Sequence, residues 1–180
     1  MTSTPGCRLL GFAGFSGSGK TTLLRQLVTL LCQRGLRIGI IKHTHHDVEQ
    51  DTPGKDSYEL RHAGAVQCLL AGPGRSILTY ENPLPQEPEL ALCLSRLDTA
   101  RLDLVLIEGF RDAPLAKLEI HRPALGRPLL CRRDAHILAV ASDRPDLEAP
   151  VPVLDLNDAA ALAGLIEQWY RAGRLPAVPG

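Results

Sequence analysis

The segment that most constrains the fold of this chain is GFSGSGKT, residues 14–21. It satisfies the pattern G-x-x-x-x-G-K-[ST] and lies between an apolar stretch, residues 7–14, and a segment with leucines at helical spacing, residues 21–35. Glycines allow consecutive backbone N–H groups to curve around an anion, and the amino end of the following helix adds partial positive charge. The motif in this context therefore predicts a loop that binds the phosphates of a nucleoside triphosphate.

Each polar group in this loop has an expected role. The Lys20 ammonium is expected to span the β- and γ-phosphates, and the Thr21 hydroxyl is expected to coordinate Mg²⁺. A turn that only links a strand to a helix is the alternative interpretation, and the pattern together with its context disfavours it. The predicted nucleotide-binding residues of the loop are Gly14, Phe15, Ser16, Gly17, Ser18, Gly19, Lys20, Thr21 and Thr22.

The order of the apolar segments predicts a parallel sheet. Residues 7–14 and 36–42 are predicted strands on either side of the first helix, and a strand-helix-strand unit makes a right-handed crossover between parallel strands. The run RLDLVLIEG has the composition of a strand in the middle of such a sheet. Further strands are predicted within residues 115–123, 136–143 and 151–156. We predict an α/β fold of the P-loop NTPase type, with a mostly parallel, doubly wound sheet in a single nucleotide-binding domain over residues 1–180.

An antiparallel insertion is predicted within this fold. Two apolar runs flank Gly72-Pro73-Gly74, which is typical of a β-hairpin, at about residues 66–80. KDSYELRHAG before it predicts a short helix, and the Pro-rich segment after it becomes helical from about Glu87. An apolar hairpin has edges that are either covered or paired with a second chain. We expect a homodimer formed through the hairpin, and packing of the hairpin on its own sheet is the alternative.

Composition excludes several classes of protein. The chain has 180 residues, 44% of them hydrophobic, which is enough for a globular core. Its 20 basic and 20 acidic residues balance, so neither a nucleic acid nor a membrane surface is an expected partner. The apolar runs are far shorter than the roughly 20 residues of a membrane span, and residues 1–10 do not resemble a signal peptide. We expect a cytoplasmic protein, whose five scattered cysteines are buried thiols.

A second acidic position supports the phosphate loop. Glu108 ends the apolar run LVLIE, where a P-loop protein places an acid that holds the Mg²⁺ shell. Aspartate is the commoner acid there, and Gly109 after it could shift the role of Glu108 to the positioning of water. A capping or loop glutamate is the alternative. No DxxG sequence follows, which disfavours a signalling GTPase of the Ras type.

The base specificity is less clear from the sequence. Guanine is usually recognised by N-K-x-D, whose aspartate accepts hydrogen bonds from N1 and N2. The corresponding position here follows HILAV and contains Asp143 without the lysine. Asp143 is a candidate nucleotide-binding residue, and a plain surface loop is an equally good interpretation. The motif alone favours neither ATP nor GTP.

The segment KHTHHDVEQDTPGKDS, residues 42–57, follows the second predicted strand and leaves the sheet at the edge where ligands bind. Asp51 and Asp47 are candidates for the Mg²⁺ shell, and Asp47 is also a candidate catalytic residue. A transition-metal site and a solvated loop are alternatives, although the adjacent His45 and His46 point to opposite faces of an extended strand. The candidates for contact with phosphate, a second anion or a partner are Lys42, His43, His45, His46, Lys55 and Arg61.

With these motifs in place, the chain resembles the MobB family of molybdopterin-guanine dinucleotide biosynthesis adaptor proteins. The resemblance rests on GFSGSGKTTL, on KHTHHDVEQDTPGKDSYELRHAGA and on LVLIEGFRDAPLAKLEI, and it is loose beyond Pro123. Val48 stands where the family pattern has an aromatic residue, which affects only the packing of that loop.

The resemblance implies a dimeric P-loop protein that binds GTP with Mg²⁺ and hydrolyses it slowly at most. It also implies a role beside MobA, the nucleotidyltransferase that joins GMP from GTP to molybdopterin, and molybdopterin is a candidate second ligand. A small-molecule kinase or an ATP-dependent ligase is the alternative function. In that case Glu108 and Asp47 would position the acceptor, and Lys20 with Mg²⁺ would stabilise the transferring phosphoryl group.

Overall fold

The computed structural model describes residues 6–82, 84 and 86–179. The chain forms two compact units, of which one is Thr44–Pro88 and the other contains the described residues before and after that segment. We refer to them as the insert unit and the sheet unit. The single domain predicted for residues 1–180 stays a prediction. Among the described residues, the helices are all too short or too polar to cross a membrane.

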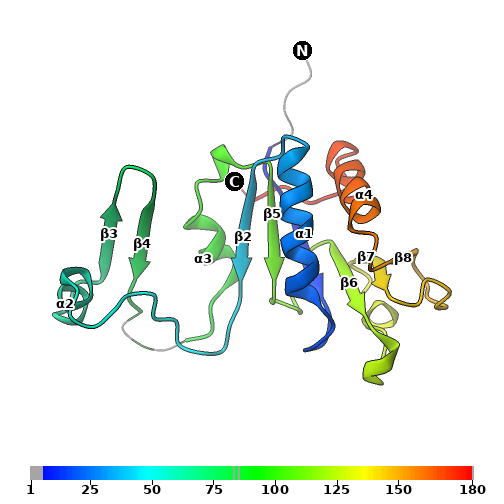
Figure 1. The fold of residues 1–180 in the computed structure, drawn as a ribbon, viewed down its shortest axis with the longest axis horizontal. Helices are drawn as coiled ribbons and strands as arrows, with labels where there is room; N and C mark the ends of the chain where they lie inside the picture. Colours follow the sequence, from blue (N-terminus) through cyan, green and yellow to red (C-terminus); the bar gives the residue numbers. More distant parts are fainter. Residues whose placement is uncertain (1–5, 83, 85, 180) are drawn as a thin grey trace, which may run out of the picture. The chain divides into compact units, whose positions relative to one another are not determined.

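The sheet unit is built on six strands in the order β2-β5-β1-β6-β7-β8, and every neighbouring pair is parallel (Figure 1). The strands are β1 (Arg8–Ala13), β2 (Ile38–Lys42), β5 (Leu104–Glu108), β6 (Lys117–His121), β7 (Ile137–Ser142) and β8 (Val153–Asp155). β1 lies between β5 and β6, so the strand order reverses around it, and ligands bind at such a switch point. The predicted parallel sheet is confirmed.

Helices cover both faces of this sheet. α1 (Lys20–Gln33) and α4 (Ala159–Arg171) pack together on one face, as Figure 1 shows, and α3 (Leu90–Ser95) packs on the other. Leu27 and Leu31 of α1 are completely buried against the sheet. Each such side chain contributes about 1.5–3 kcal/mol relative to an exposed one. The short 3-10 helices are Thr99–Arg101, Pro123–Leu125 and Leu130–Arg132.

One predicted helix boundary is wrong. The helix after the Pro-rich segment begins at Leu90, whereas the sequence predicted a start near Glu87. Pro88 restricts the residue before it to extended backbone, and Glu89 is itself extended, with φ −89° and ψ 134°. Pro88 thus keeps Glu87 out of the helix, and the helix begins directly after the extended Glu89.

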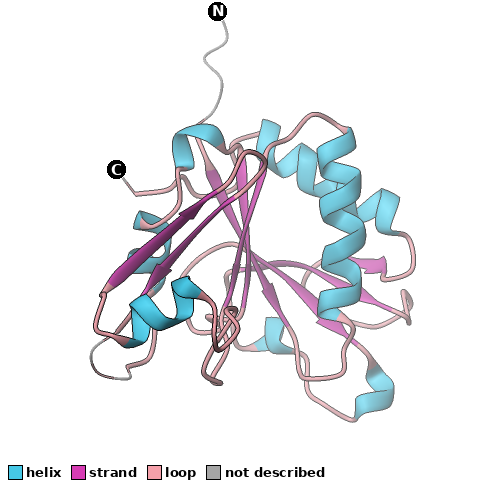
Figure 2. Cartoon of the chain, turned by 60° about the vertical axis from the view of Figure 1, so that its left-hand side comes forward, coloured by secondary structure: helices cyan, strands magenta, loops and turns pink. Residues whose placement is uncertain are grey.

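The insert unit contains one helix and a two-stranded antiparallel sheet (Figure 2). α2 (Asp56–His62) precedes β3 (Gln67–Ala71) and β4 (Ser76–Tyr80), and the register pairs Leu69 with Leu78. The predicted hairpin is confirmed. An isolated two-stranded hairpin is marginally stable in water, so its packing partners determine its stability.

Candidate functional site

The glycine-rich loop runs from the carboxyl end of β1 to the amino end of α1, in the centre of the sheet unit. Gly14 has φ +150°, and a Cβ added there would lie 2.5 Å from the carbonyl oxygen of Ile120 and 2.9 Å from Ser18 Oγ. Gly19, with φ +95°, precedes the first residue of α1. A side chain at Gly14 is therefore excluded by contact, and one at Gly19 is disfavoured by backbone conformation.

The Lys20 side chain folds back onto this loop. Its Nζ donates hydrogen bonds of 2.9 Å to the carbonyl oxygens of Gly14 and Phe15. Burial lowers the pKa of Lys20, nearby Glu108 opposes this, and the positive charges of Arg111 and Lys42 lower the pKa further. Cationic groups from three segments thus act at the place where the phosphates of a nucleotide are expected.

Thr21 and Glu108 meet beside the loop. Thr21 Oγ1 donates to Glu108 Oε1 at 3.2 Å, and Lys42 Nζ lies 3.7 Å from Glu108 Oε2. The Glu108 side chain is only 13% exposed. A hydroxyl and a carboxylate are the oxygen ligands that Mg²⁺ accepts, usually together with water and substrate phosphates.

The glycine after this glutamate has a structural reason. Gly109 has φ +98°, and a Cβ added there would lie 2.5 Å from His43 Cβ. The His43 backbone N–H donates to the Glu108 carbonyl oxygen at 2.8 Å, and its ring stacks on Phe110 with 4.7 Å between centroids. The Glu-Gly sequence therefore lets the end of β5 approach the end of β2 closely.

Three arginines that are not among the predicted site residues lie around the loop. The Cζ atoms of Arg111 and Arg127 each lie 5.4 Å from the centroid of the Phe15 ring. Arg122 Nε donates to the Ser18 carbonyl oxygen at 3.1 Å. Arg122 directly follows β6, and a polar residue after a parallel strand is a signal that the sequence does contain.

Asp143, the candidate base-binding residue, follows β7 and is paired with Arg122. The distance from Arg122 Nη1 to Asp143 Oδ2 is 2.7 Å, and both side chains are about one third exposed, at 35% and 29%. The register of β6 and β7 pairs His121 with Ser142, so the next residue of each strand is Arg122 and Asp143. A cation from a neighbouring strand thus stands beside this aspartate.

The remaining candidates belong to the insert unit and are bonded within it. His45 Nδ1 lies 3.5 Å from Glu87 Oε1 on the surface, and Asp47 Oδ1 accepts a hydrogen bond from the backbone of Val48. Hydrogen bonds from Ser57 and from the Thr52 backbone lower the pKa of Asp51. His46, Lys55 and the exposed Val48 also belong to this unit.

Arg61 is an exception among the predicted anion contacts, because it is buried. Its side chain is 5% exposed and forms ion pairs with Glu49 at 2.6 Å and with Glu81, while Asp51 lies 3.8 Å away. A buried guanidinium needs such carboxylate partners to offset its desolvation. Arg61 therefore joins α2 to the segments on either side of it.

A parallel, doubly wound sheet whose central strand leads through a glycine-rich loop into a helix defines a P-loop-like α/β protein of the nucleotide-binding class. Comparison with known families agrees: the model described as "MobB: Molybdopterin guanine dinucleotide synthesis protein B" matches residues 9–143. The chain belongs to the MobB family. The resemblance found in the sequence is thereby confirmed.

Individual relatives cover nearly the whole chain. A protein of Escherichia coli (strain K12) named molybdopterin-guanine dinucleotide biosynthesis adapter protein is 50% identical over 164 residues, which are 91% of this chain and 93% of that protein. A Haemophilus influenzae protein of the same name is 41% identical over 89% of this chain and 88% of its own length. The crystal structure of a MobB homolog from Bacillus stearothermophilus has a TM-score of 0.66 and 26% identity, covering 91% and 98% of the two chains.

A more distant relative bears on the kinase alternative. A protein of Xanthomonas campestris pv. campestris named thymidylate kinase is 32% identical over 163 residues. The match covers 89% of this chain and 61% of that protein.

Proposed function

We propose that this protein binds GTP with Mg²⁺ in the loop of residues 14–21 and serves as the adaptor of a MobA-type nucleotidyltransferase in the synthesis of the molybdenum guanine dinucleotide cofactor. The observation that carries this proposal is the meeting of Lys20, Thr21, Lys42 and Glu108 around one glycine-rich loop in a chain of the MobB family. The names of the relatives support the adaptor role.

The loop residues suit a triphosphate. The Ser18 Oγ is buried and, within the described part of the chain, makes no hydrogen bond, so a ligand oxygen would satisfy it. Lys20 Nζ rests on two carbonyl oxygens and exchanges them for phosphate oxygens when a nucleotide enters. Mg²⁺, when bound, neutralises charge on the β- and γ-phosphates, and Thr21 and Glu108 would hold it.

The surroundings of Glu108 support the proposal that GTP is hydrolysed slowly at most. A general base needs a carboxylate within hydrogen-bonding reach of the attacking water. The two carboxylate oxygens of Glu108 face the Thr21 hydroxyl and the Lys42 ammonium. This arrangement suits a ligand of the metal shell better than a proton acceptor, so Lys20 and Glu108 bind and stabilise the triphosphate rather than drive rapid turnover.

The proposed contacts with other molecules come from the end of β2 in the sheet unit and from the insert unit. Lys42 at the end of β2, together with His43, His45, His46 and Lys55, is proposed to meet the partner or a second anion such as molybdopterin. Asp47 and Asp51 remain proposed residues of the metal shell. Arg61 is proposed to stabilise the insert unit through its carboxylate partners, because its burial leaves it poorly placed to bind an external anion.

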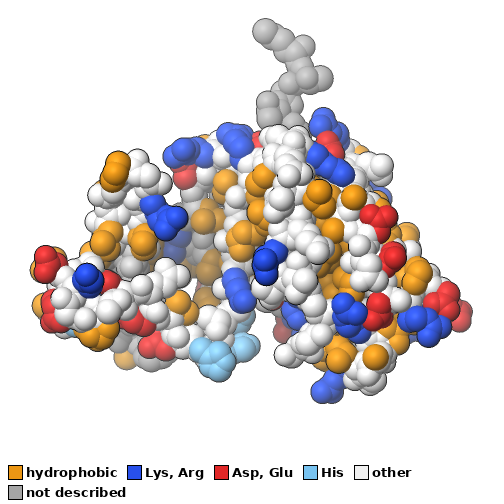
Figure 3. All heavy atoms as spheres, viewed as in Figure 1, with side chains coloured by type: hydrophobic (Ala, Val, Ile, Leu, Met, Phe, Trp, Pro, Cys, Tyr) orange, Lys and Arg blue, Asp and Glu red, His pale blue; other side chains and the backbone are white. Residues whose placement is uncertain are grey.

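A homodimer through the hairpin is part of the proposal. Leu69 and Leu78 are opposite each other on one face of the hairpin and are 62% and 46% exposed. Leu70 and Ile77, the next pair in the register, are also exposed. Figure 3 shows hydrophobic side chains, in orange, on the surface of the part of the chain that contains β3 and β4. Apolar residues on both faces of a small sheet favour association with another chain. We also propose that the protein is located in the cytoplasm.

A small-molecule kinase is the second candidate, and the match to a protein named thymidylate kinase favours it. Both candidates use the same phosphate loop, so the loop does not separate them. They differ in the preferred nucleotide and in whether an acceptor is consumed.

The adaptor role is tested by reconstitution with a purified MobA-type enzyme, molybdopterin, GTP and Mg²⁺. Formation of a complex on size-exclusion chromatography and a rise in guanine dinucleotide yield on addition of this protein are expected. Lys20→Ala should lose the rise in yield, and Arg101→Ala, on an exposed 3-10 helix, serves as the matched control. No complex and no change in yield would contradict the adaptor role.

A further inference from the structure

We propose that the cavity beside the phosphate loop receives the base of the nucleotide, and that Arg122 selects guanine there by donating to O6 and N7. This inference rests on the proposed binding of GTP and deepens it. It assigns recognition of the O6 and N7 edge to Arg122 in a chain that has no N-K-x-D sequence after β7.

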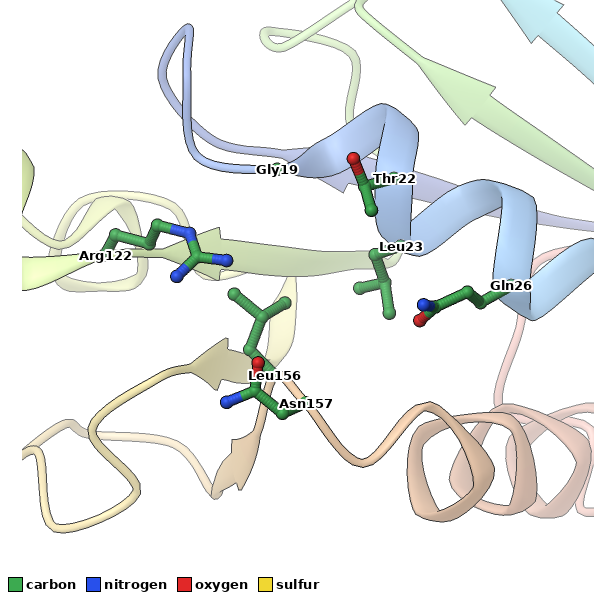
Figure 4. Close-up of a pocket in the computed structure, with 7 residues that line it drawn as sticks. All are labelled: Gly19, Thr22, Leu23, Gln26, Arg122, Leu156 and Asn157. Carbon is green, nitrogen blue, oxygen red and sulfur yellow. The ribbon is translucent and has the colours of Figure 1, made fainter.

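The cavity adjoins the end of the phosphate loop and the first turns of α1. It encloses about 130 Å³ between the amino end of α1 and the segments that follow β6 and β8 (Figure 4). It begins at Gly19, the last residue of the loop before α1, and its walls include Thr22, Gln26 and Asn157. Pockets that bind drug-sized ligands measure about 300–1,000 Å³, so this smaller cavity has room for one ring system rather than a whole nucleotide.

The walls of the cavity suit a flat, polar-edged ring. Figure 4 shows Arg122 on one side of the cavity and Leu23 and Gln26 of α1 on the other, with Leu156 and Asn157, which follow β8, between them. Leucine side chains offer apolar contact for the faces of a base, and the guanidinium and amides can hydrogen-bond to its edges.

Arg122 is held in a fixed orientation at this cavity. Its Nε donates to the Ser18 carbonyl oxygen, and its Nη1 pairs with Asp143 at 2.7 Å. A Cβ added at Gly19 would lie 3.6 Å from Arg122 Nη2, so the guanidinium stands directly beside the end of the phosphate loop. Two anchors on one guanidinium lower the entropy that a hydrogen bond from it would cost.

Guanidinium chemistry distinguishes guanine from adenine. Guanine presents two acceptors, O6 and N7, side by side, which is the pattern that arginine recognises with two donors. Adenine presents an amino group at the position of O6, and a donor facing a donor cannot form a hydrogen bond. Asp143 acts here as a positioning residue, because its carboxylate holds the Arg122 fork and follows β7 in register with it.

The experiment is calorimetric titration in the presence of Mg²⁺. GTP, 7-deaza-GTP, ATP and tripolyphosphate are each titrated into the wild type and into Arg122→Gln. We expect Arg122→Gln to weaken GTP binding roughly tenfold to a hundredfold, the worth of one arginine–guanine pair. ATP and tripolyphosphate should change less than about threefold, since neither uses the pair. Arg133→Gln, an exposed arginine away from the loop, is the control that should leave all four affinities unchanged.

Two further measurements keep the test decisive. 7-deaza-GTP lacks the N7 acceptor, so the wild type should bind it several-fold more weakly than GTP without any mutation. Arg122→Lys keeps the charge beside Asp143 but lacks the fork, and it should lose most of the preference for GTP over ATP. Equal weakening of GTP, ATP and tripolyphosphate in Arg122→Gln would overturn the inference, because Arg122 would then act on the phosphate loop through Ser18.

The failure of this inference differs from the failure of the proposed function. If the wild type binds GTP and prefers it to ATP, but Arg122→Gln keeps that preference and 7-deaza-GTP binds as well as GTP, only the inference is wrong. If the wild type fails to bind GTP, or binds ATP equally well, both are wrong.

Discussion

The charged residues of the sheet unit and those of the insert unit are used in different ways. Around the phosphate loop, Arg111 and Lys42 lie near Lys20 and the Glu108 carboxylate. Lys20 rests on carbonyl oxygens that a phosphate can replace. In the insert unit, Arg61 is buried among the carboxylates of Glu49, Asp51 and Glu81. The first arrangement keeps an excess of positive charge for a ligand, whereas the second neutralises its charge internally. Charge composition alone would not have separated a binding site from a stabilising cluster.

The apolar residues show the reverse contrast. The leucines of α1 are buried in the core of the sheet unit, whereas those of the hairpin are exposed. A buried core of this kind supports a rigid site, whereas an exposed apolar surface favours association with a partner. Each prediction below tests one side of this comparison.

The largest effect is expected in the core. Leu27→Ala should lower the free energy of unfolding by about 2–5 kcal/mol, because it leaves a cavity in a completely buried position between α1 and the sheet. Urea denaturation followed by circular dichroism measures this. Leu92→Ala, an exposed leucine on α3, is the control and should cost less than about 1 kcal/mol. A small loss at Leu27 would mean that this core is not what supports the loop.

Association should respond to a charge on the hairpin. Leu78→Lys places an ammonium group in the exposed apolar surface and should weaken dimerisation at least about tenfold, since a charge buried without a partner is costly. Sedimentation equilibrium would show monomers at concentrations where the wild type is dimeric. Leu92→Lys is the matched control in the sheet unit. Monomeric wild type, or a dimer indifferent to Leu78→Lys, would rule out this interface.

The insert unit should loosen when its cation is removed. Arg61→Met leaves Glu49 and Glu81 without their partner, and native-state hydrogen exchange at α2 and β4 should become roughly tenfold faster. Amides of β1 and β5 should keep their protection. Unchanged exchange at α2 would show that the Arg61 cluster does not stabilise the insert unit.

The last effect is expected only at alkaline pH, in the sheet unit. Burial, with the nearby Glu119 carboxylate adding to it, raises the pKa of the Cys131 thiol to about 11, from an ordinary value near 9. Below pH 9 the thiol is protonated in the folded and unfolded chains, so it has no effect there. Between pH 9 and 11 only the unfolded chain ionises, and stability should fall by at most about 2 kcal/mol.

Urea denaturation at pH 8.5 and 10.5 would measure this fall. Cys131→Ala should lose less stability than the wild type over this interval. Cys32, which the sequence predicted to be buried, is exposed, and Cys32→Ala should behave like the wild type. Equal losses in all three proteins would remove Cys131 as the cause.

Much of the fold could be predicted because its signals are local. The loop motif and the apolar runs specified β1, α1, β2 and β5, and the turn Gly72-Pro73-Gly74 specified the hairpin. The start of α3 was missed because Pro88 acts on its neighbours more strongly than helix propensity does. Features of the site that depend on tertiary structure could not be predicted from the sequence. The pairing of Arg122 with Asp143 depends on the register of β6 and β7, and the burial of Arg61 runs against the usual exposure of arginine.

The central claim is that the loop of residues 14–21 binds GTP through Lys20, and calorimetric titration of GTP and ATP with Mg²⁺ into the wild type and Lys20→Ala tests it most directly. We predict that GTP binds the wild type at least tenfold more tightly than ATP does, and that Lys20→Ala weakens GTP binding about a hundredfold or more, since it removes a charged contact to the phosphates. The melting temperature of Lys20→Ala should stay close to that of the wild type. Equal or tighter binding of ATP, or GTP binding that survives Lys20→Ala, would contradict the account.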